Sequence, residues 1–265
     1  MFHLKESVCL LCLFLFESAF GGIDLSSGQT DESFLRQMQI GNLRFSSGYT
    51  YTFRNGSRCI SDGSDYQAVQ SAFQTWLQEP SSSLWAVETS ARRGFTPGRM
   101  NGQNDISWIS PTEKNPNPWK TVLNLPERML AAVMMWVNPS TGCVLERDLY
   151  FNDVSVDWRT ASDGLSAGGY WVERIALHEI GHLFGLRDIY NSGQKGWESW
   201  MGDGNEGLAM YGYSYWQDES AGLQWADIAA MAWPILRCPS RVRCRYLRWG
   251  QRCFSLPEKC DPFLF

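Results

Sequence analysis

Histidine is scarce in this chain: the 265 residues contain only His3, His178 and His182. No apolar run beyond the first twenty residues is long enough to cross a bilayer as a helix, which takes about 20 residues. The sequence also lacks internal repeats and long low-complexity segments, which excludes solenoid and repeat architectures. Any histidine-based site in the folded domain must therefore be built from the pair at 178 and 182.

Residues 1–21 have the pattern of a secretory signal peptide. Lys5 precedes the apolar run from Val8 to Phe16, and a stretch rich in small residues follows it. A run of nine residues is too short for a membrane span and fits the core of a signal peptide. We therefore expect a secreted, extracellular protein. Residues 22–44 are polar and weakly patterned, which predicts a short, mobile lead-in or propeptide remnant.

Six cysteines remain beyond the expected signal peptide: Cys59, Cys143, Cys238, Cys244, Cys253 and Cys260. An even number in an exported protein predicts disulfide bonds, although six cysteines allow fifteen pairings. The four C-terminal cysteines are close enough to pair among themselves, which would leave Cys59 with Cys143. Residues 237–265 form a basic, disulfide-rich tail with seven Lys and Arg against two acids, a net charge of 7 − 2 = +5. This tail is either a solvated face or a contact surface for acidic glycans or membranes.

Residues 45–236 predict one α+β domain. Alternating or continuous apolar residues indicate strands at 49–53, 105–109, 131–137 and 145–151, and helical spacing indicates a helix at 66–77 with Asp62 or Ser64 as its cap. A helix from Trp171 to Leu183 or Phe184 and a last helix over 223–232 complete the pattern. The order of these elements predicts an α+β layout in which one helix carries the functional residues.

The run from His178 to Asp188 reads His-Glu-Ile-Gly-His-Leu-Phe-Gly-Leu-Arg-Asp. On a helix, His178 and His182 share one face and can hold one metal ion, and Glu179 is placed as a general base. Gly185 can end the helix with a positive φ and return the chain, which makes Asp188 the candidate third ligand. Two histidines, one carboxylate and an open fourth position are typical of a catalytic zinc site.

This run resembles the extended zinc signature of the metzincin metalloproteases. Its aspartate third ligand is similar to that of snapalysin and the immune-inhibitor-type enzymes, and blocks at 73–76, 105–109 and 148–152 are similar to those of secreted matrixins. The resemblance covers roughly residues 45–236 and implies a metzincin-like catalytic domain, with a twisted mixed sheet, an active-site helix and a C-terminal helix. It also implies a methionine turn beneath the metal, for which Met201 is favoured over Met210.

Three further assignments remain open in the sequence. Tyr190, Tyr211 and Tyr213 are all eligible to stabilise a developing oxyanion. Asp148, Asn152 and Asp153 form either a calcium site, as the matrixin resemblance implies, or a strand end with turn carboxylates. Ala131–Val137 is the candidate edge strand for an extended substrate.

The expected function is that of a secreted zinc endopeptidase that hydrolyses protein or peptide substrates, with Glu179 as the base. We expect a monomer with no nucleic-acid partner and no membrane span. The alternative is a secreted binding or adhesion protein whose zinc site is only structural. The presence of Glu179 and the absence of an evident fourth ligand favour the enzyme.

Overall fold

The computed structural model describes residues 37–41, 43–78, 84–91, 94–163, 168–199, 201–214 and 222–232. The expected signal peptide at 1–21, the first part of the lead-in and the basic tail at 237–265 lie outside the described residues. The sequence therefore remains the basis for those three assignments. No helix in the described ranges is long and apolar enough to cross a membrane.

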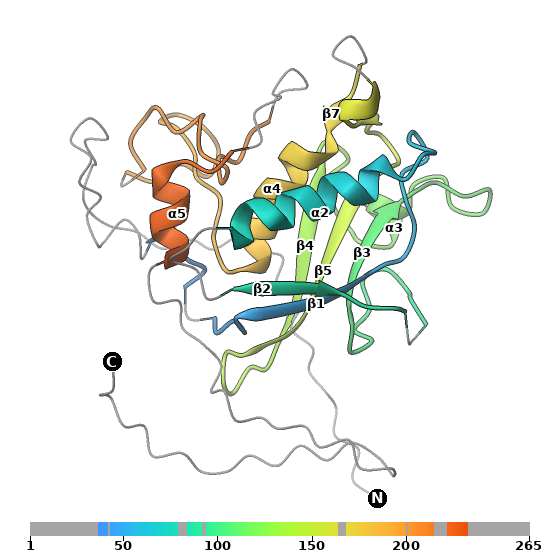
Figure 1. The fold of residues 1–265 in the computed structure, drawn as a ribbon, viewed down its shortest axis with the longest axis horizontal. Coiled ribbons are helices and arrows are strands. Elements are labelled where there is room, and N and C mark those ends of the chain that lie inside the picture. The colour runs from blue at the N-terminus through green and yellow to red at the C-terminus, as the bar shows by residue number, and fades with distance from the viewer. Residues whose placement is uncertain are drawn as a thin grey trace, which may run out of the picture.

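A five-stranded mixed sheet forms the centre of the molecule (Figure 1). Its strands are β1 (Gly48–Phe53), β2 (Trp85–Glu88), β3 (Asn104–Ile109), β4 (Ala131–Val137) and β5 (Val144–Asn152). The order across the sheet is β2-β1-β3-β5-β4. The neighbouring pairs run parallel except β4, which is antiparallel to β5. The expectation of a mixed sheet is confirmed.

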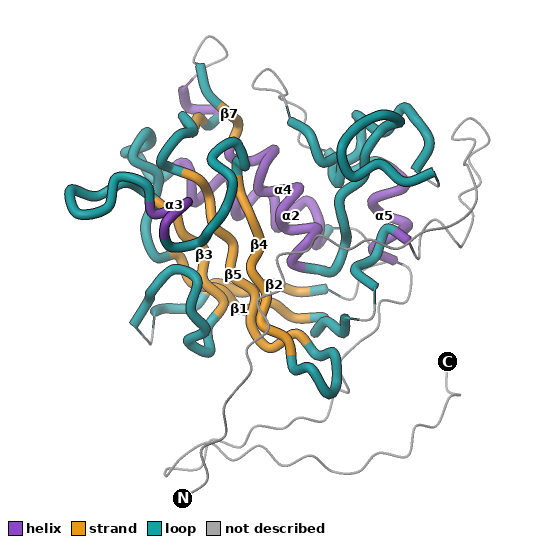
Figure 2. The backbone as a smooth tube through the Cα atoms, turned by 180° about the vertical axis from the view of Figure 1, so that it is seen from behind, coloured by secondary structure: helices purple, strands orange, loops and turns teal. Residues whose placement is uncertain are grey.

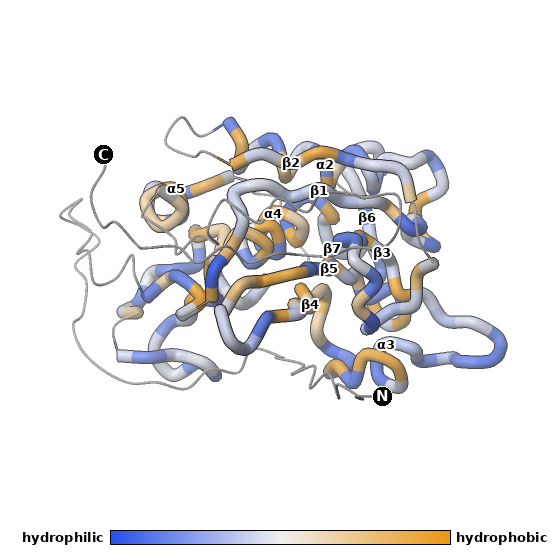
Figure 3. The backbone as a smooth tube through the Cα atoms, turned by 90° about the horizontal axis from the view of Figure 1, so that it is seen from below, coloured by the Kyte–Doolittle hydropathy of each residue, from blue (hydrophilic) through white to orange (hydrophobic). Residues whose placement is uncertain are grey.

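Helices cover both faces of this sheet. Helices α2 (Ser64–Leu77) and α4 (Val172–Leu183) pack on one face, and the short α3 (Pro118–Thr121) lies on the other, as the rear view shows (Figure 2). Trp76 on α2 is fully buried, and its Nε1–H donates to the backbone oxygen of Leu177 on α4, 2.8 Å away. The helix α5 (Trp225–Ala232) lies beside this layer and presents Ala230 and Met231 to the core. Apolar residues follow the strands and α4 in Figure 3.

Helix α2 begins differently from the sequence-based expectation. Its N-cap is Gly63, with φ of 78°, and no side chain caps the first turn. Asp62 instead accepts a hydrogen bond from the backbone N–H of Ser64 in a local turn. The assignment of Asp62 or Ser64 as the cap is wrong because glycine can adopt the left-handed entry to the helix that these residues disfavour.

Strand β5 is buried along most of its length and carries charged residues inside the protein. Successive side chains point to opposite faces. Arg147 therefore reaches α4, where it donates to the backbone oxygen of Leu183. It also donates to the hydroxyl of Ser46 and the backbone oxygen of Gly48 at the start of β1. Glu146 and Asp148 point to the opposite face. A buried cation at the C-terminal end of α4 also complements the negative end of the helix dipole.

The end of the expected lead-in packs against the domain. Met38, Ile40 and Phe45 are exposed by 0%, 2% and 0%. The segment forms isolated bridges between Gln39 and Leu186 and between Arg44 and Cys143. A polar composition with few apolar residues hides this role, because three well-placed apolar side chains suffice to anchor a short segment.

The remaining elements are small: a pair formed by β6 (Trp158–Arg159) and β7 (Tyr170–Trp171), and a 3-10 turn at Ala161–Asp163. Strand β4 matches the expected range at both ends. Strand β2 and helix α3 were not expected. Strand β2 has four residues, mostly exposed, so the sequence carries no alternation from which to infer it.

Candidate metal centre

Helix α4 places both histidines on the same surface. Its buried residues pack toward α2 and the sheet, while His178 and His182, one turn apart, are only partly covered. Gly185, with φ of 103°, lets the chain reverse after the last turn, and the backbone N–H of Leu186 bonds back to the oxygen of Gly181 at 2.9 Å. The expected role of Gly185 as the helix terminator is confirmed.

Backbone carbonyls fix the tautomers of the two rings. His178 Nδ1 lies 2.9 Å from the oxygen of Ala209, and His182 Nδ1 lies 2.7 Å from the oxygen of Leu186. A carbonyl can only accept a hydrogen bond, so each Nδ1 carries the proton. In the neutral rings, each Nε2 then presents a lone pair, which is the form in which histidine binds metals.

The two Nε2 atoms converge on Asp188. Its Oδ1 lies 3.0 Å from His178 Nε2 and 3.2 Å from His182 Nε2. When both rings are neutral, the two Nε2 atoms and Asp188 Oδ1 are three acceptors that face one another, which requires a cation between them. Ligand atoms about 2.0 to 2.1 Å from a tetrahedral ion are roughly 3.3 Å apart, close to both distances. The residues present therefore fit a metal ion.

Glu179 adds a second carboxylate to the same place. His178, Glu179 and His182 offer ligand atoms within 4.8 Å of one another, a group that could hold a metal ion. Glu179 is only 6% exposed, and its Oε2 is buried without a hydrogen-bond partner. Burial raises the pKa of Glu179, an effect that the neighbouring His182 and His178 oppose. A buried carboxylate oxygen without a hydrogen-bond partner is unfavourable for folding, so Glu179 is a candidate functional residue.

Charge holds the metal-free site together. Burial raises the pKa of Asp188, but the charge of His182 and the close contacts of the carboxylate with both histidines outweigh it and hold that pKa well below its usual range. Burial lowers the pKa of His182, whereas the Asp188 carboxylate raises it more strongly, to about 9. A proton on His182 thus occupies the place that a metal ion would take.

The methionine beneath the helix is Met210, not the favoured Met201. A Cβ at Gly181, between the two histidines, would lie 2.1 Å from Met210 Sδ. Met201 is also buried, but its sulfur accepts a hydrogen bond from the N–H of Tyr190 at 3.3 Å. Sequence could not separate the two methionines because both lie in glycine-rich turns after the motif.

The Met210 turn is fixed from two sides by residues that sequence reasoning missed. Arg174 of α4 donates to the oxygens of Leu208 and Ala209 at 3.2 Å each. Asp227 of α5 is 0% exposed and accepts from the N–H groups of Ala209 and Met210 at 2.9 and 3.2 Å. The oxygen that orients His178 is therefore itself held in place. A lone acid in the otherwise apolar α5 was the available signal.

The three candidate tyrosines have different surroundings. Tyr190 donates its hydroxyl to Asp188 Oδ2 at 3.2 Å, and a Cβ at Gly196 or Gly212 would lie 2.5 or 2.3 Å from its ring. Tyr211 accepts a hydrogen bond from Gln194. Tyr213 is 40% exposed and packs edge-on against Tyr190. Tyr190 thus supports the third ligand directly.

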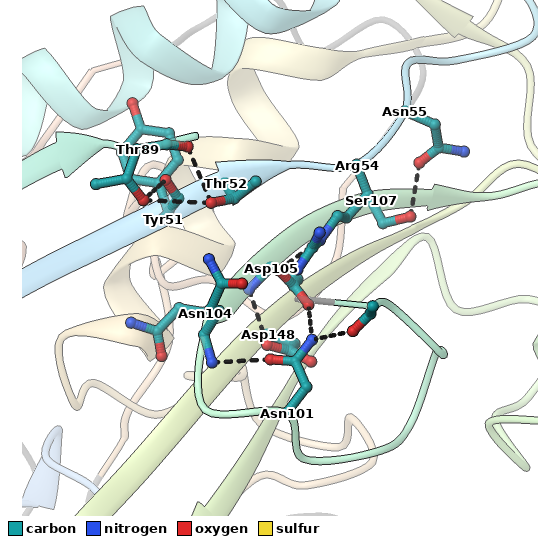
Figure 4. Close-up of polar contacts among 12 residues, drawn as sticks. Tyr51, Thr52, Arg54, Asn55, Thr89, Asn101, Asn104, Asp105, Ser107 and Asp148 are labelled. Atoms are coloured by element: carbon teal, nitrogen blue, oxygen red, sulfur yellow. Dashed lines mark hydrogen bonds and ion pairs between the residues drawn. The ribbon is translucent and has the colours of Figure 1, made fainter. Parts of the chain in front are cut away.

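The expected calcium residues do not form one site. Asp148 accepts from the hydroxyl of Tyr150 and the N–H of Asp105, whereas Asp153 accepts from Ser57, Arg58 and Ser110. Asn152 donates its amide to backbone carbonyls. In the described part of the chain, the group of side chains close enough to hold a metal ion lies around His178, Glu179 and His182 of α4, and none of these three calcium candidates belongs to it. Asp148 instead belongs to a buried network that also contains Asp105, Asn101 and Arg54 (Figure 4).

The expected pairing of Cys59 with Cys143 is absent. Both are free cysteines, and Cys59 lies on the surface with its sulfur 3.8 Å from Asp157 Oδ1. Cys143 follows the turn between β4 and β5 and bridges to Arg44. The other four cysteines expected to form disulfides lie outside the described residues.

No model of a known protein family matches the chain. No curated protein matches it either. The interpretation of the site therefore depends on its own geometry.

Proposed function

We propose that this chain is a secreted zinc endopeptidase of the metzincin type. The observation that carries the proposal is the convergence of His178 Nε2, His182 Nε2 and Asp188 Oδ1 beside the unpartnered Oε2 of Glu179. Nitrogen and carboxylate ligands at tetrahedral spacing favour zinc over calcium, which prefers six to eight oxygen ligands. Three protein ligands leave the fourth position free for chemistry.

Zinc held there would supply a Lewis acid that polarises a scissile carbonyl and makes water a nucleophile near neutral pH. Glu179 Oε2 then takes the proton from the attacking water and passes it to the nitrogen of the leaving amine. Burial favours this role because it raises the pKa of Glu179 and brings that pKa nearer to the pH at which the proton moves. Asp188 and Tyr190 keep the metal-binding atoms in place.

An extended peptide would bind along β4. Strand β4 is one edge of the sheet, and α4 packs against it. Among the described residues, β4 pairs with β5 on one side only. A peptide added to the free edge gains backbone hydrogen bonds that do not depend on its side chains. This arrangement supports a protein or peptide substrate.

The alternative is a secreted binding or adhesion protein with a structural zinc site. Such a site would carry a fourth protein ligand and have no need of a buried base. The unpartnered state of Glu179 favours the enzyme.

The test is cleavage of casein or gelatin by the purified protein, with and without a zinc chelator, beside Glu179→Gln. Glu173→Gln is the matched control because it removes a carboxylate from the same helix outside the metal group. We expect Glu179→Gln to retain zinc and to lose about 10²- to 10⁴-fold in kcat/KM, and Glu173→Gln to retain activity. A zinc-loaded wild type that cleaves no protein or peptide library would refute the endopeptidase and favour the binding protein.

A further inference from the structure

A short segment from the N-terminal side of the domain contacts the turn between the second and third candidate ligands. The N–H of Ile40 donates to the oxygen of Gly185 at 2.7 Å, and the N–H of Arg187 donates to the oxygen of Met38 at 2.8 Å. These two bonds form an antiparallel bridge centred on Gln39 and Leu186. The residue after this bridge is Asp188.

Asp188 is held by backbone pairings on both sides. On its far side, the N–H of Ile189 donates to the oxygen of Met210 at 2.9 Å, and the N–H of Gly212 donates to the oxygen of Ile189 at 2.8 Å. The Met210 turn thus pairs with the backbone on one side of Asp188, and Met38–Ile40 pairs with it on the other side. Loss of either pairing would free one flank of the carboxylate that must meet both histidines.

Side chains anchor the segment independently of the turn. Met38 and Ile40 are buried, and Gln39 Nε2 donates to the oxygen of Ala230 on α5 at 3.2 Å. The ring of Phe45 packs under Gly185, where an added Cβ would come within 2.9 Å of it. The segment is therefore fixed to the core and can act as a template for the turn.

We propose that Met38–Ile40 is a positioning segment for Asp188, so that metal affinity depends on its remaining attached. This inference rests on the proposed metal site and adds a control on it. Proteolytic maturation that ends before residue 37 would preserve the site. A cut between Ile40 and Phe45 would weaken metal binding although every ligand is still present.

The first test compares Ile40→Pro with Ile40→Ala in the full chain. Both replace the buried isoleucine side chain with a smaller one, but only proline removes the N–H that donates to Gly185. We expect the Kd for zinc to be about 10- to 100-fold higher in Ile40→Pro than in Ile40→Ala, which is the loss of affinity typical for groups that orient metal ligands. The visible spectrum of the cobalt-substituted protein should change only in the proline variant. Equal zinc affinities and equal cobalt spectra would overturn the proposal.

A second measurement uses the wild type and does not depend on the folding of a variant. Coupling between two sites is reciprocal, so zinc must strengthen the pairing that strengthens zinc binding. Zinc should slow hydrogen exchange at the amides of Ile40 and Arg187 more than at the amide of Arg54, which bonds to Ile106 in the sheet. Equal slowing at all three amides would refute the coupling. Both tests measure metal binding, so they remain decisive for this segment even if the protein cleaves no peptide.

Discussion

Asp148 links the buried network of the sheet to the pH dependence of folding. It lies in the middle of β5 with no exposed surface, and its neighbours Glu146 and Asp105 are also buried acids. Burial raises the pKa of Asp148 to about 8, although hydrogen bonds from Tyr150 and the N–H of Asp105 oppose the rise, and the two acids add to it. The folded protein therefore keeps a proton on this side chain that the unfolded chain loses.

The sign of the effect follows from proton counting. Between the unfolded pKa of 3.8 and the folded pKa of about 8, the native state binds one more proton than the unfolded state. The free energy of unfolding contributed by Asp148 consequently falls as pH rises through this window, by about 1.4 kcal/mol per pH unit. Over the whole window, the contribution of Asp148 to the free energy of unfolding falls by roughly 5 to 6 kcal/mol, which is comparable to the stability of many domains.

Replacement with asparagine tests this reasoning. Asp148→Asn cannot ionise, and its amide can resemble the protonated acid by accepting from Asp105 and donating to the Tyr150 oxygen. We expect the free energy of unfolding of metal-free Asp148→Asn, measured with urea between about pH 4.5 and 8, to have a different dependence on pH. Its slope against pH should be about 1.4 kcal/mol per unit less negative than that of the wild type. Glu113→Gln, at an exposed position, is the control. Coincident slopes for wild type and Asp148→Asn would show that Asp148 is ionised in the fold and that the reasoning is wrong.

Two further predictions concern the metal centre. Gly185→Ala should destabilise the protein by about 2 to 4 kcal/mol, because alanine disfavours φ of 103° and its Cβ would crowd Phe45. In a Phe45→Ala background only the backbone part of this loss should remain in urea unfolding, and an undiminished loss would contradict the contact. Zinc binding at pH 7.5 should release about one proton from His182, because its pKa of about 9 leaves it protonated without metal. Calorimetry in two buffers of different ionisation enthalpy measures this release, and identical heats would disprove it.

The expectations that succeeded depend on residues close together in the sequence. The four-residue spacing of His178 and His182 fixes a shared helix face, and Gly185 follows at the position where a left-handed turn can end the helix. Strand β4 could be located because its seven apolar residues are continuous. Such features are local, so their geometry follows from backbone periodicity alone.

The expectations that failed depend on which distant segments meet. For Asp148 and Asn152 of β5 and the following Asp153, the sequence left a calcium site and a strand end as alternatives, because each side chain finds its partners on a different loop or strand. The cap of α2 went to Gly63 because the approach of the preceding chain requires a left-handed residue there. The pairing of Cys59 with Cys143 was expected only because the other four cysteines could pair among themselves. That argument contains no information on the distance between the two sulfur atoms.

Several features of the candidate metal centre could be predicted from the sequence: the nature and spacing of the candidate ligands, the candidate base beside them and the turn that returns Asp188. Three other features required the folded structure: Met210 lies beneath the helix, the Ala209 oxygen orients His178, and Met38–Ile40 flanks the candidate third ligand Asp188. The physical reason is that these contacts are made through backbone groups and well-packed side chains. Every residue carries the same backbone N–H and C=O, so their partners are chosen by the packing of the whole chain.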